Sequence, residues 1–277
     1  MPVLKKFEGR EAKIDGRRMH YVDQGSGPPL LLLHGAGPAA GFAVHYGKNI
    51  EPLAREFRVI APDLPGFGNS EAAQTGEPGS VVNARAAAKL LEHLGIQRAF
   101  VAGYSMGGSA AMRLCADHGE RVEKAIFLGG GNSFPKFAGP ALPEGLRLMM
   151  ELNKKPGREL FDQVHRLFVH DASLISDAML DELWARDSEI RARRTGPAPT
   201  PPPDPLFERM PHVKVPTLIV RARDDAFGPL DQGIVALWAI PNSRLYVIPG
   251  CGHWIQYEKP EEFHKLARWY FLDGPPV

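Results

Sequence analysis

A single serine stands between glycines in the segment Gly103-Tyr104-Ser105-Met106-Gly107. The segment matches the pattern G-x-S-x-G, with a strand-like run before it and a helix-like run after it, and in that context the pattern forms a tight strand-to-helix turn. Such a turn leaves no room for side chains two residues either side of the serine. The sequence therefore predicts that Ser105 is a nucleophile held above a sheet, where the helix N-terminus favours an anionic intermediate. A tight turn with an incidental serine is the alternative.

A serine hydroxyl needs a base to remove its proton, and the base needs an acid to orient it. In this class of motif the chain order is serine, acid, histidine. His253 follows the last strand-like run and precedes the last helix-like run, so we predict that it is the base. Asp224 and Asp225 follow the preceding strand-like run. We predict that Asp225 is the acid because it lies nearer the loop, and Asp224 is the alternative.

The segment His34-Gly35-Ala36-Gly37-Pro38 follows another strand-like run. Its flexible backbone can direct the N–H of Ala36, together with that of Met106, at the oxygen of a tetrahedral intermediate. A plain glycine-rich turn would explain the glycines but not their coincidence with the other catalytic candidates. A phosphate-binding loop is disfavoured because no Gly-Lys-Ser/Thr follows, and the dinucleotide fingerprint G-x-G-x-x-G is absent here.

Strand-like and helix-like runs alternate along most of the chain, which predicts an α/β fold with a mostly parallel sheet flanked by helices. The expected strands are Met19 to Asp23, Leu30 to His34, Arg58 to Ala61, Ala99 to Ala102, Ala125 to Leu128, Thr217 to Arg221 and Arg244 to Ile248. The expected helices of this core are Val44 to Glu56, Val81 to Leu94, Gly107 to His118, Asp231 to Ala239 and Glu261 to Phe271.

The alternation stops after about Gly131, where an insertion of several helices is predicted. Residues 1–133 and 205–277 are expected to form the core, and residues 134–204 a helical lid with a proline-rich return segment. The predicted lid helices are Gly145 to Leu152, Gly157 to Val169 and Asp177 to Ala192. The prolines between 196 and 205 favour an extended connector. A ligand for a polyproline-binding domain is the alternative for that segment.

The overall composition favours a small-molecule substrate. Lys and Arg (33) nearly balance Asp and Glu (32), which argues against nucleic acid or an anionic membrane as partner. With no signal-like N-terminus and no membrane-length apolar run, we expect a cytoplasmic protein. Cys115 and Cys251 have no metal or redox spacing, so we expect no metal, no cofactor and no disulfide. A homo-oligomer is left open.

With these residues placed, the chain resembles the α/β-hydrolase superfamily. More narrowly, it resembles the meta-cleavage-product hydrolases, which cut a carbon–carbon bond in ring-fission products of aromatic catabolism. The resemblance rests on the segments His34 to Gly41, Val82 to Ala86, Ser105 to Gly108, Arg223 to Asp231 and Cys251 to Trp254. It implies that Asp225 is the acid and that Phe168, Phe227 and Trp254 line a pocket beneath the lid, with Gly35 and Gly37 beside the substrate.

Three positions depart from the pattern of that family. The two asparagines that help to hold the dienoate end of the substrate fall at His45 and Tyr104, and the lid arginine that pairs with the substrate carboxylate falls at Leu183. Leucine removes a bidentate partner for a carboxylate. Arg186 is a candidate replacement because it lies three residues further along the same helix face.

The leading hypothesis is a serine-dependent hydrolase with a Ser-Asp-His triad that cleaves a carbon–carbon bond of a meta-cleavage-product-like or diketone compound. One alternative is a carboxylesterase or lactonase acting on a small neutral substrate. A second is a cofactor-independent lyase or oxygenase in which histidine is the base and Ser105 only positions the substrate. A ligand receptor without activity is a third, because a fold alone does not fix a function.

Overall fold

The computed structural model describes residues 4–73, 75–130, 142–193 and 204–274. Within these ranges one eight-stranded sheet has the order β1-β2-β4-β3-β5-β6-β7-β8, with antiparallel pairing at β1–β2 and β2–β4 and parallel pairing elsewhere. The strands are β1 Arg10–Ile14, β2 Arg17–Gln24, β3 Pro29–Leu33, β4 Arg58–Pro62, β5 Ala99–Tyr104, β6 Val122–Leu128, β7 Thr217–Ala222 and β8 Ser243–Ile248. The predicted α/β class and mostly parallel sheet are confirmed, although the sequence did not predict β1.

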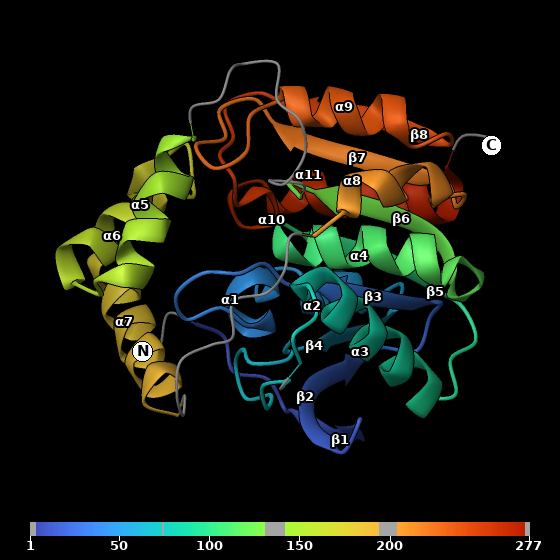
Figure 1. Ribbon diagram of the computed structural model, residues 1–277, viewed down its shortest axis with the longest axis horizontal. Helices are drawn as coiled ribbons and strands as arrows, with labels where there is room; N and C mark the ends of the chain where they lie inside the picture. Colours follow the sequence, from blue (N-terminus) through green and yellow to red (C-terminus); the bar gives the residue numbers. More distant parts are fainter. Residues whose placement is uncertain (1–3, 74, 131–141, 194–203, 275–277) are drawn as a thin grey trace.

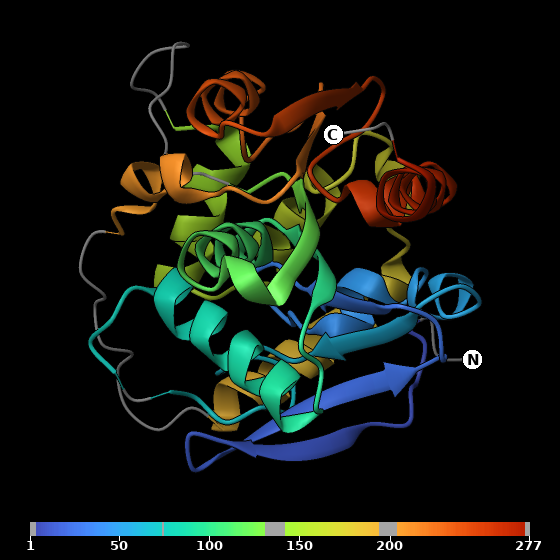
Figure 2. The ribbon, with the colours of Figure 1, turned by 90° about the vertical axis from the view of Figure 1, so that its right-hand side faces the viewer.

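Helices cover both faces of the sheet (Figure 2). The longer ones are α3 Gly79–His93, α4 Met106–Asp117, α5 Glu144–Lys154, α6 Arg158–Leu167, α7 Asp177–Arg193, α9 Asp231–Ala239 and α11 Pro260–Arg268. The shorter ones are α1 Phe42–Tyr46, α2 Ile50–Leu53, α8 Leu206–Arg209, α10 Ile255–Glu258, the 3₁₀ turns Gly119–Arg121, Ala172–Leu174 and Met210–His212, and the π-helical turn Trp269–Asp273.

The strands of the parallel part are apolar along their whole length because both of their faces are buried. In β3, Leu30 and Leu32 face the core cluster that contains α1 and α11, whereas Leu31 and Leu33 face the cluster that contains α3 and α4. The register pairs Leu33 with Gly103 and Tyr104 with Leu128. The carboxyl ends of these strands therefore meet at one edge, where α/β proteins bind their ligands.

The prediction of a single helix over Val44 to Glu56 is wrong. The structure has two short helices, α1 and α2, separated by Gly47-Lys48-Asn49. Asn49 is fully buried, and its side chain donates to the carbonyl of Gln256 (3.0 Å) and bonds to His264 (2.9 Å). These contacts with the C-terminal part of the chain fix the break, and no local propensity reveals them.

Helices α5, α6 and α7 stack together beside one end of the sheet (Figure 1). They contact the loops at the carboxyl ends of the strands: Trp254 donates its backbone N–H to Phe168 (2.7 Å), and Gly145 donates its own to Ala226 (2.9 Å). All three helices begin and end within a few residues of their predicted limits. The predicted proline-rich return segment lies almost wholly outside the described residues.

No helix in the described part of the chain has the length and apolar character needed to cross a bilayer. Cys115 and Cys251 are both buried and unpaired. Burial raises the pKa of each thiol well above its ordinary value. Neither cysteine is therefore a reactive thiolate at neutral pH.

Candidate active site

Ser105 occupies the turn between β5 and α4 with φ 51° and ψ −114°, a conformation that residues with a side chain rarely adopt. Its backbone N–H donates to the carbonyl of Leu128 (2.7 Å), which holds the turn against β6. A Cβ on Gly103 would lie 2.2 Å from the Gly107 carbonyl oxygen, and one on Gly107 would lie 2.1 Å from the Leu33 carbonyl oxygen. The two glycines are therefore required by close backbone contacts on either side of the serine.

A chain of hydrogen bonds leads from Ser105 to a buried carboxylate. Nε2 of His253 lies 2.9 Å from Oγ of Ser105, and Nδ1 of His253 lies 2.7 Å from Oδ2 of Asp225. An ionised carboxylate selects the tautomer with hydrogen on Nδ1, which leaves Nε2 free to accept the serine proton. The structure thus brings together the three residues that were predicted to form a triad.

Asp225 is held as an anion. Burial alone would raise its pKa, but His253, the buried guanidinium of Arg221 and the backbone N–H of Gly228 outweigh burial, and the pKa lies below its ordinary value. The second carboxylate oxygen accepts from the N–H groups of Phe227 (2.7 Å) and Gly228 (2.9 Å). The carboxylate is therefore fixed on both sides, and its charge faces the imidazole.

Arg221 is a supporting residue that the sequence analysis did not single out. It is fully buried at the end of β7 and donates to the carbonyls of Gly130 (2.9 Å), Gly228 (2.9 Å) and Pro229 (2.8 Å). It therefore shapes the loop that carries Asp225 and adds positive charge beside it. An arginine near the end of an otherwise apolar strand, four residues before the acid, was the available signal.

Asp224 has a different position. Its carboxylate accepts from the N–H of Gly250 (2.9 Å) and pairs with Arg223 (3.3 Å). These contacts connect the ends of β7 and β8 at a half-exposed place. Asp224 forms no bond to His253 within the described residues, so of the two adjacent carboxylates only Asp225 reaches the imidazole.

The loop after β3 passes directly beside Ser105. A Cβ on Gly35 would lie 2.7 Å from the ring of Tyr104 and 3.2 Å from Cβ of Ser105. Across the described ranges, the backbone N–H of Ala36 forms no hydrogen bond, nor does that of Met106, which is the first residue of α4 and has no partner within its own helix. Two free N–H groups close to a nucleophile can hold a developing oxyanion.

Aromatic side chains enclose the imidazole. Phe168 and Phe227 are stacked with centroids 4.3 Å apart and planes 6° apart, and the His253 ring lies 5.1 Å from Phe227 and 6.0 Å from Phe168. Trp254 meets Phe168 edge-on at 6.1 Å. On the lid side, Cζ of Phe168 lies 3.6 Å from the place where Gly37 would carry a Cβ. The residues expected to line the pocket are thus brought together around His253.

Three buried polar atoms in the same place have no hydrogen-bond partner among the described residues: Nδ1 of His45, Oη of Tyr104 and Nε1 of Trp254. The ring of His45 lies 5.0 Å from that of Tyr104 and 5.5 Å from that of Trp254. Tyr104 in turn lies 5.2 Å from His253. An unpaired buried polar group costs about 1–3 kcal/mol, and a polar part of a ligand could supply the missing partner.

His45 is neutral in this environment. Burial lowers its pKa well below the ordinary value, and the neighbouring His34, His165, His253 and Arg186 lower it further. No carboxylate is among the largest contributions to that shift. The surroundings therefore favour an electron-rich oxygen over a cation.

Leu183 and Arg186 face different surroundings. Leu183 is fully buried in the apolar core cluster, together with Met179 and Leu180 of the same helix. Arg186 extends toward the loop after β3 and donates from Nε to the carbonyl of Ala39 (3.1 Å). Of the two residues, only Arg186 carries a cation, and its Nε is bonded to the backbone of the loop after β3.

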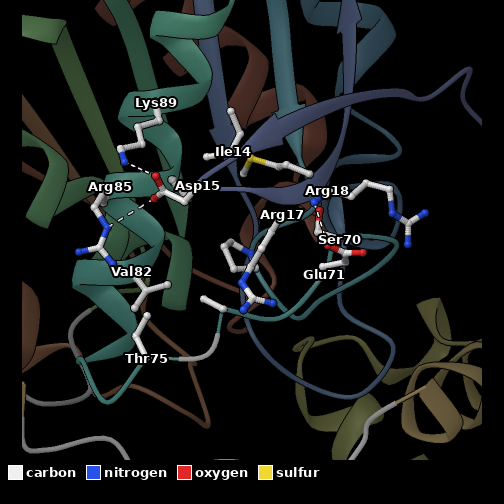
Figure 3. A pocket seen from close by; sticks show the side chains of 14 residues that line it. Ile14, Asp15, Arg17, Arg18, Ser70, Glu71, Thr75, Val82, Arg85 and Lys89 are labelled. Atoms are coloured by element: carbon white, nitrogen blue, oxygen red, sulfur yellow. Dashed lines mark hydrogen bonds and ion pairs between the residues drawn. The ribbon is translucent and has the colours of Figure 1, made fainter.

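A separate cavity of about 450 Å³ lies between the β1–β2 turn, the loop around Ser70 and helix α3 (Figure 3). It contains none of the candidate site residues. Most of its charges are satisfied locally, since Asp15 pairs with both Arg85 and Lys89, and the backbone N–H of Arg18 donates to Glu71. Over the described ranges, no three His, Cys, Asp or Glu side chains gather as metal ligands would.

Comparison with known proteins gives a consistent picture. A family model described as "alpha/beta hydrolase fold" matches residues 28–260. The chain is 36% identical over 270 residues to a 2-hydroxy-6-oxo-6-phenylhexa-2,4-dienoate hydrolase of Burkholderia cepacia, covering 95% of this chain and 94% of that one. It is 35% identical over 256 residues to a 2-hydroxy-6-oxononadienedioate/2-hydroxy-6-oxononatrienedioate hydrolase of Paraburkholderia phymatum, covering 90% and 89%.

Among solved structures, a variant of the meta-cleavage product hydrolase CumD from Pseudomonas fluorescens superimposes with a TM-score of 0.83. Its sequence is 25% identical, and the match covers 96% of this chain and 98% of CumD. The resemblance stated from the sequence is therefore confirmed over nearly the whole chain.

Proposed function

Since this chain belongs to the α/β-hydrolase family and is a hydrolase, we propose that it cleaves the carbon–carbon bond of a ketone of the meta-cleavage-product type, with Ser105 as nucleophile. The observation that carries the proposal is the continuous hydrogen-bond chain from Ser105 through His253 to Asp225. The names of relatives at 35% and 36% identity support the choice of bond. The proposal goes beyond those names because it assigns each step to residues of this chain.

In the first half of the reaction, Oγ of Ser105 adds to the keto carbon while Nε2 of His253 takes the hydroxyl proton. The carbonyl oxygen becomes an alkoxide, and the N–H groups of Ala36 and Met106 hold it. Asp225 stabilises the imidazolium without taking its proton. The neutral, buried Tyr104 and the two stacked phenylalanines keep water away from the charges that form.

In the second half, the alkoxide collapses and the carbon–carbon bond breaks, so that its electron pair leaves with the departing carbon. That carbon must be protonated as the bond breaks or before it, because an unstabilised carbanion is too poor a leaving group. The imidazolium of His253 supplies a proton. Conjugation that places the electron pair on a distant oxygen helps, and the unpaired groups of His45, Tyr104 and Trp254 are available to bind such an oxygen.

The cycle ends when water hydrolyses the ester formed on Ser105. His253, again neutral, removes a proton from the water, and the same two N–H groups hold the second oxyanion. A carboxylic acid leaves and Ser105 is restored. The proposed carbon–carbon cleavage thus differs from ester hydrolysis chiefly in what must stabilise the first leaving group.

Hydrolysis of a small neutral ester or lactone is the second candidate, and Leu183 favours it. This residue is apolar and buried where the resemblance places an arginine. A substrate without a carboxylate needs no cation there. Arg186, three residues further along the helix and bonded through Nε to the loop after β3, is the candidate partner for the carboxylate of a dienoate.

The experiment compares kcat/KM for a chromophoric 2-hydroxy-6-oxo-dienoate, a neutral diketone of similar size and an aryl ester. Carbon–carbon cleavage predicts that the dienoate or the diketone is preferred, and that Ser105→Ala loses at least about a thousandfold in kcat. Preference for the ester alone would select the second candidate. If Ser105→Ala keeps most of the activity toward the dienoate, the serine only positions the substrate, and the proposal is wrong.

A further inference from the structure

Two side chains of the lid hydrogen-bond to the backbone of Ala39, in the loop that carries Ala36. The backbone N–H of Ala39 donates to Oδ1 of Asp187 (3.1 Å), and its carbonyl accepts from Nε of Arg186 (3.1 Å). Asp187 and Arg186 are neighbours on α7. Both polar backbone groups of one core residue are thus bound by two consecutive side chains from the lid, 147 and 148 positions further along the chain.

Ala39 has a backbone conformation that needs such support. Its φ is 58°, in the left-handed region that disfavours a residue with a Cβ, and it is buried with 1% of its surface exposed. A residue held in this region persists only where its surroundings determine its conformation. Here the surroundings include the two side chains of α7.

The conformation of Ala39 is linked to that of Ala36 through a short turn. The N–H of Ala40 donates to the carbonyl of Gly37 (3.3 Å), which closes the turn from Gly37 to Ala40. On its other side, Gly35 lies against Tyr104 and Ser105 too closely to accept a Cβ. The loop is therefore fixed at Gly35 by the core and at Ala39 by the lid, with the N–H of Ala36 between these points.

We propose that Asp187, assisted by Arg186, is a positioning residue that sets the place of the Ala36 N–H through Ala39. The proposal rests on the proposed function, because that N–H matters only when an oxyanion forms. It goes further in making part of the oxyanion site depend on the lid.

The surroundings of Asp187 suit this role. Its side chain is nearly fully buried, and its second oxygen accepts from Nε of Arg191 (2.5 Å), so the carboxylate is anchored from its own helix. His165 of α6 lies beside the carbonyl of Pro38 and near Asp187. Three lid side chains therefore face the backbone of residues 38 and 39, and of these only Asp187 offers an acceptor to an N–H.

Loss of this acceptor should affect the transition state more than substrate binding. The oxyanion exists only after Ser105 has attacked, so a displaced Ala36 N–H lowers kcat and leaves KM nearly unchanged. Removal of an oxyanion donor typically costs about a hundred- to a thousandfold in kcat. Because Asp187→Leu would displace the donor without removing it, we expect a fall of about 10- to 100-fold.

The test uses the full-length enzyme with p-nitrophenyl acetate, because hydrolysis of this ester needs the oxyanion site whichever bond the natural substrate offers. Active sites are counted by complete labelling of Ser105 with a fluorophosphonate. The variants are Asp187→Leu, Asp187→Asn, which keeps an acceptor oxygen for Ala39, and Arg186→Met, which keeps the alkyl chain. Glu189→Gln, an exposed carboxylate on the same helix, is the control for lost charge.

The proposal expects kcat per labelled site to fall in Asp187→Leu with an unchanged KM and pH profile. It should fall less in Arg186→Met and in Asp187→Asn, and it should stay within about threefold of wild type in Glu189→Gln. Unchanged kcat per site in Asp187→Leu, or equal losses in Asp187→Leu and Asp187→Asn, would overturn it. If Asp187→Leu does not fold, Arg186→Met provides the test, and an unchanged kcat per labelled site in that variant would overturn the proposal. A wild type that neither labels nor hydrolyses the ester would instead refute the proposed function.

Discussion

Replacement of Tyr104 by phenylalanine should make the free protein more stable and its reaction with a ketone slower. The Tyr104 ring is completely buried, and its hydroxyl has no partner among the described residues. Burial raises the pKa of that hydroxyl well above its ordinary value, with a further contribution from the nearby charge of Asp225. The group is therefore a neutral, unpaired hydroxyl beside the catalytic imidazole.

The size of the effect follows from the cost of leaving such a group unpaired, which is about 1–3 kcal/mol. Loss of one oxygen atom also removes a few packing contacts, so we expect a net gain of about 1 kcal/mol in the free energy of unfolding. For a chain of this length that corresponds to a rise of about 2–4 °C in Tm.

Tyr46 offers a matched control within the same fold. It is also completely buried, but its hydroxyl donates to the carbonyls of Leu33 (3.2 Å) and Ala102 (3.4 Å). Tyr46→Phe leaves two acceptors without their donor, so we expect a loss of about 1 kcal/mol. The same chemical change should thus move the stability in opposite directions at the two positions.

The assay is urea unfolding followed by tryptophan fluorescence, together with kcat/KM for the dienoate or diketone and for an aryl acetate. Tyr104→Phe should lower kcat/KM for the ketone about tenfold, because one hydrogen bond to the substrate is worth about 1.4 kcal/mol. The value for the acetate should change less than about twofold, since that substrate has no second polar group. If Tyr104→Phe destabilises the protein as much as Tyr46→Phe does, the hydroxyl has a protein partner and the reasoning fails.

Two further predictions concern the acid and the buried histidines. Asp225→Asn should lower kcat in steady-state assays by about a thousand- to ten-thousandfold. Asp224→Asn should keep kcat within about fivefold of wild type. Equal losses in the two variants would show that the geometry misidentifies the acid. Burial lowers the pKa of His165 from 6.5 to about 4 despite the nearby Asp187 and Asp162. The unfolded chain therefore binds a proton that the folded chain does not, and stability falls as pH falls from about 6.5 toward 4. The contribution of His165 at pH 4.5 relative to pH 7 is about 2–3 kcal/mol, so urea unfolding of His165→Gln should show a shallower pH slope than wild type, and identical slopes would contradict the prediction.

The parts of the fold and site that the sequence predicted are those that depend on local patterns. Strands with two buried faces appear as apolar runs, and a motif between a strand and a helix indicates a turn at the sheet edge. Ser105, Asp225 and His253 each follow a strand, so the parallel order alone was enough to expect their proximity. The helix over Asp231–Ala239 was predicted to the residue because its apolar spacing is local.

Contacts between distant parts of the chain could not be predicted in this way. The break between α1 and α2 depends on Asn49 and its partners more than 200 residues away. Arg221 appears in the sequence only as an arginine in an apolar strand, and its role emerges from the carbonyls that surround it. The hydrogen bonds between α7 and Ala39 join side chains to backbone groups. Every residue has the same backbone groups, so the sequence does not show which of them will be bonded.

The identity of the substrate could not be predicted for the same reason, because it depends on contacts between distant parts of the chain. The triad candidates are fully paired with one another, so they define a class of chemistry but not the ligand. In contrast, His45, Tyr104 and Trp254 each carry a buried polar atom that has no hydrogen-bond partner among the described residues. Whether a polar atom is satisfied depends on all of its neighbours, which residue types alone do not reveal. Under the proposed carbon–carbon cleavage, a substrate oxygen placed among these groups would supply the partner that they lack.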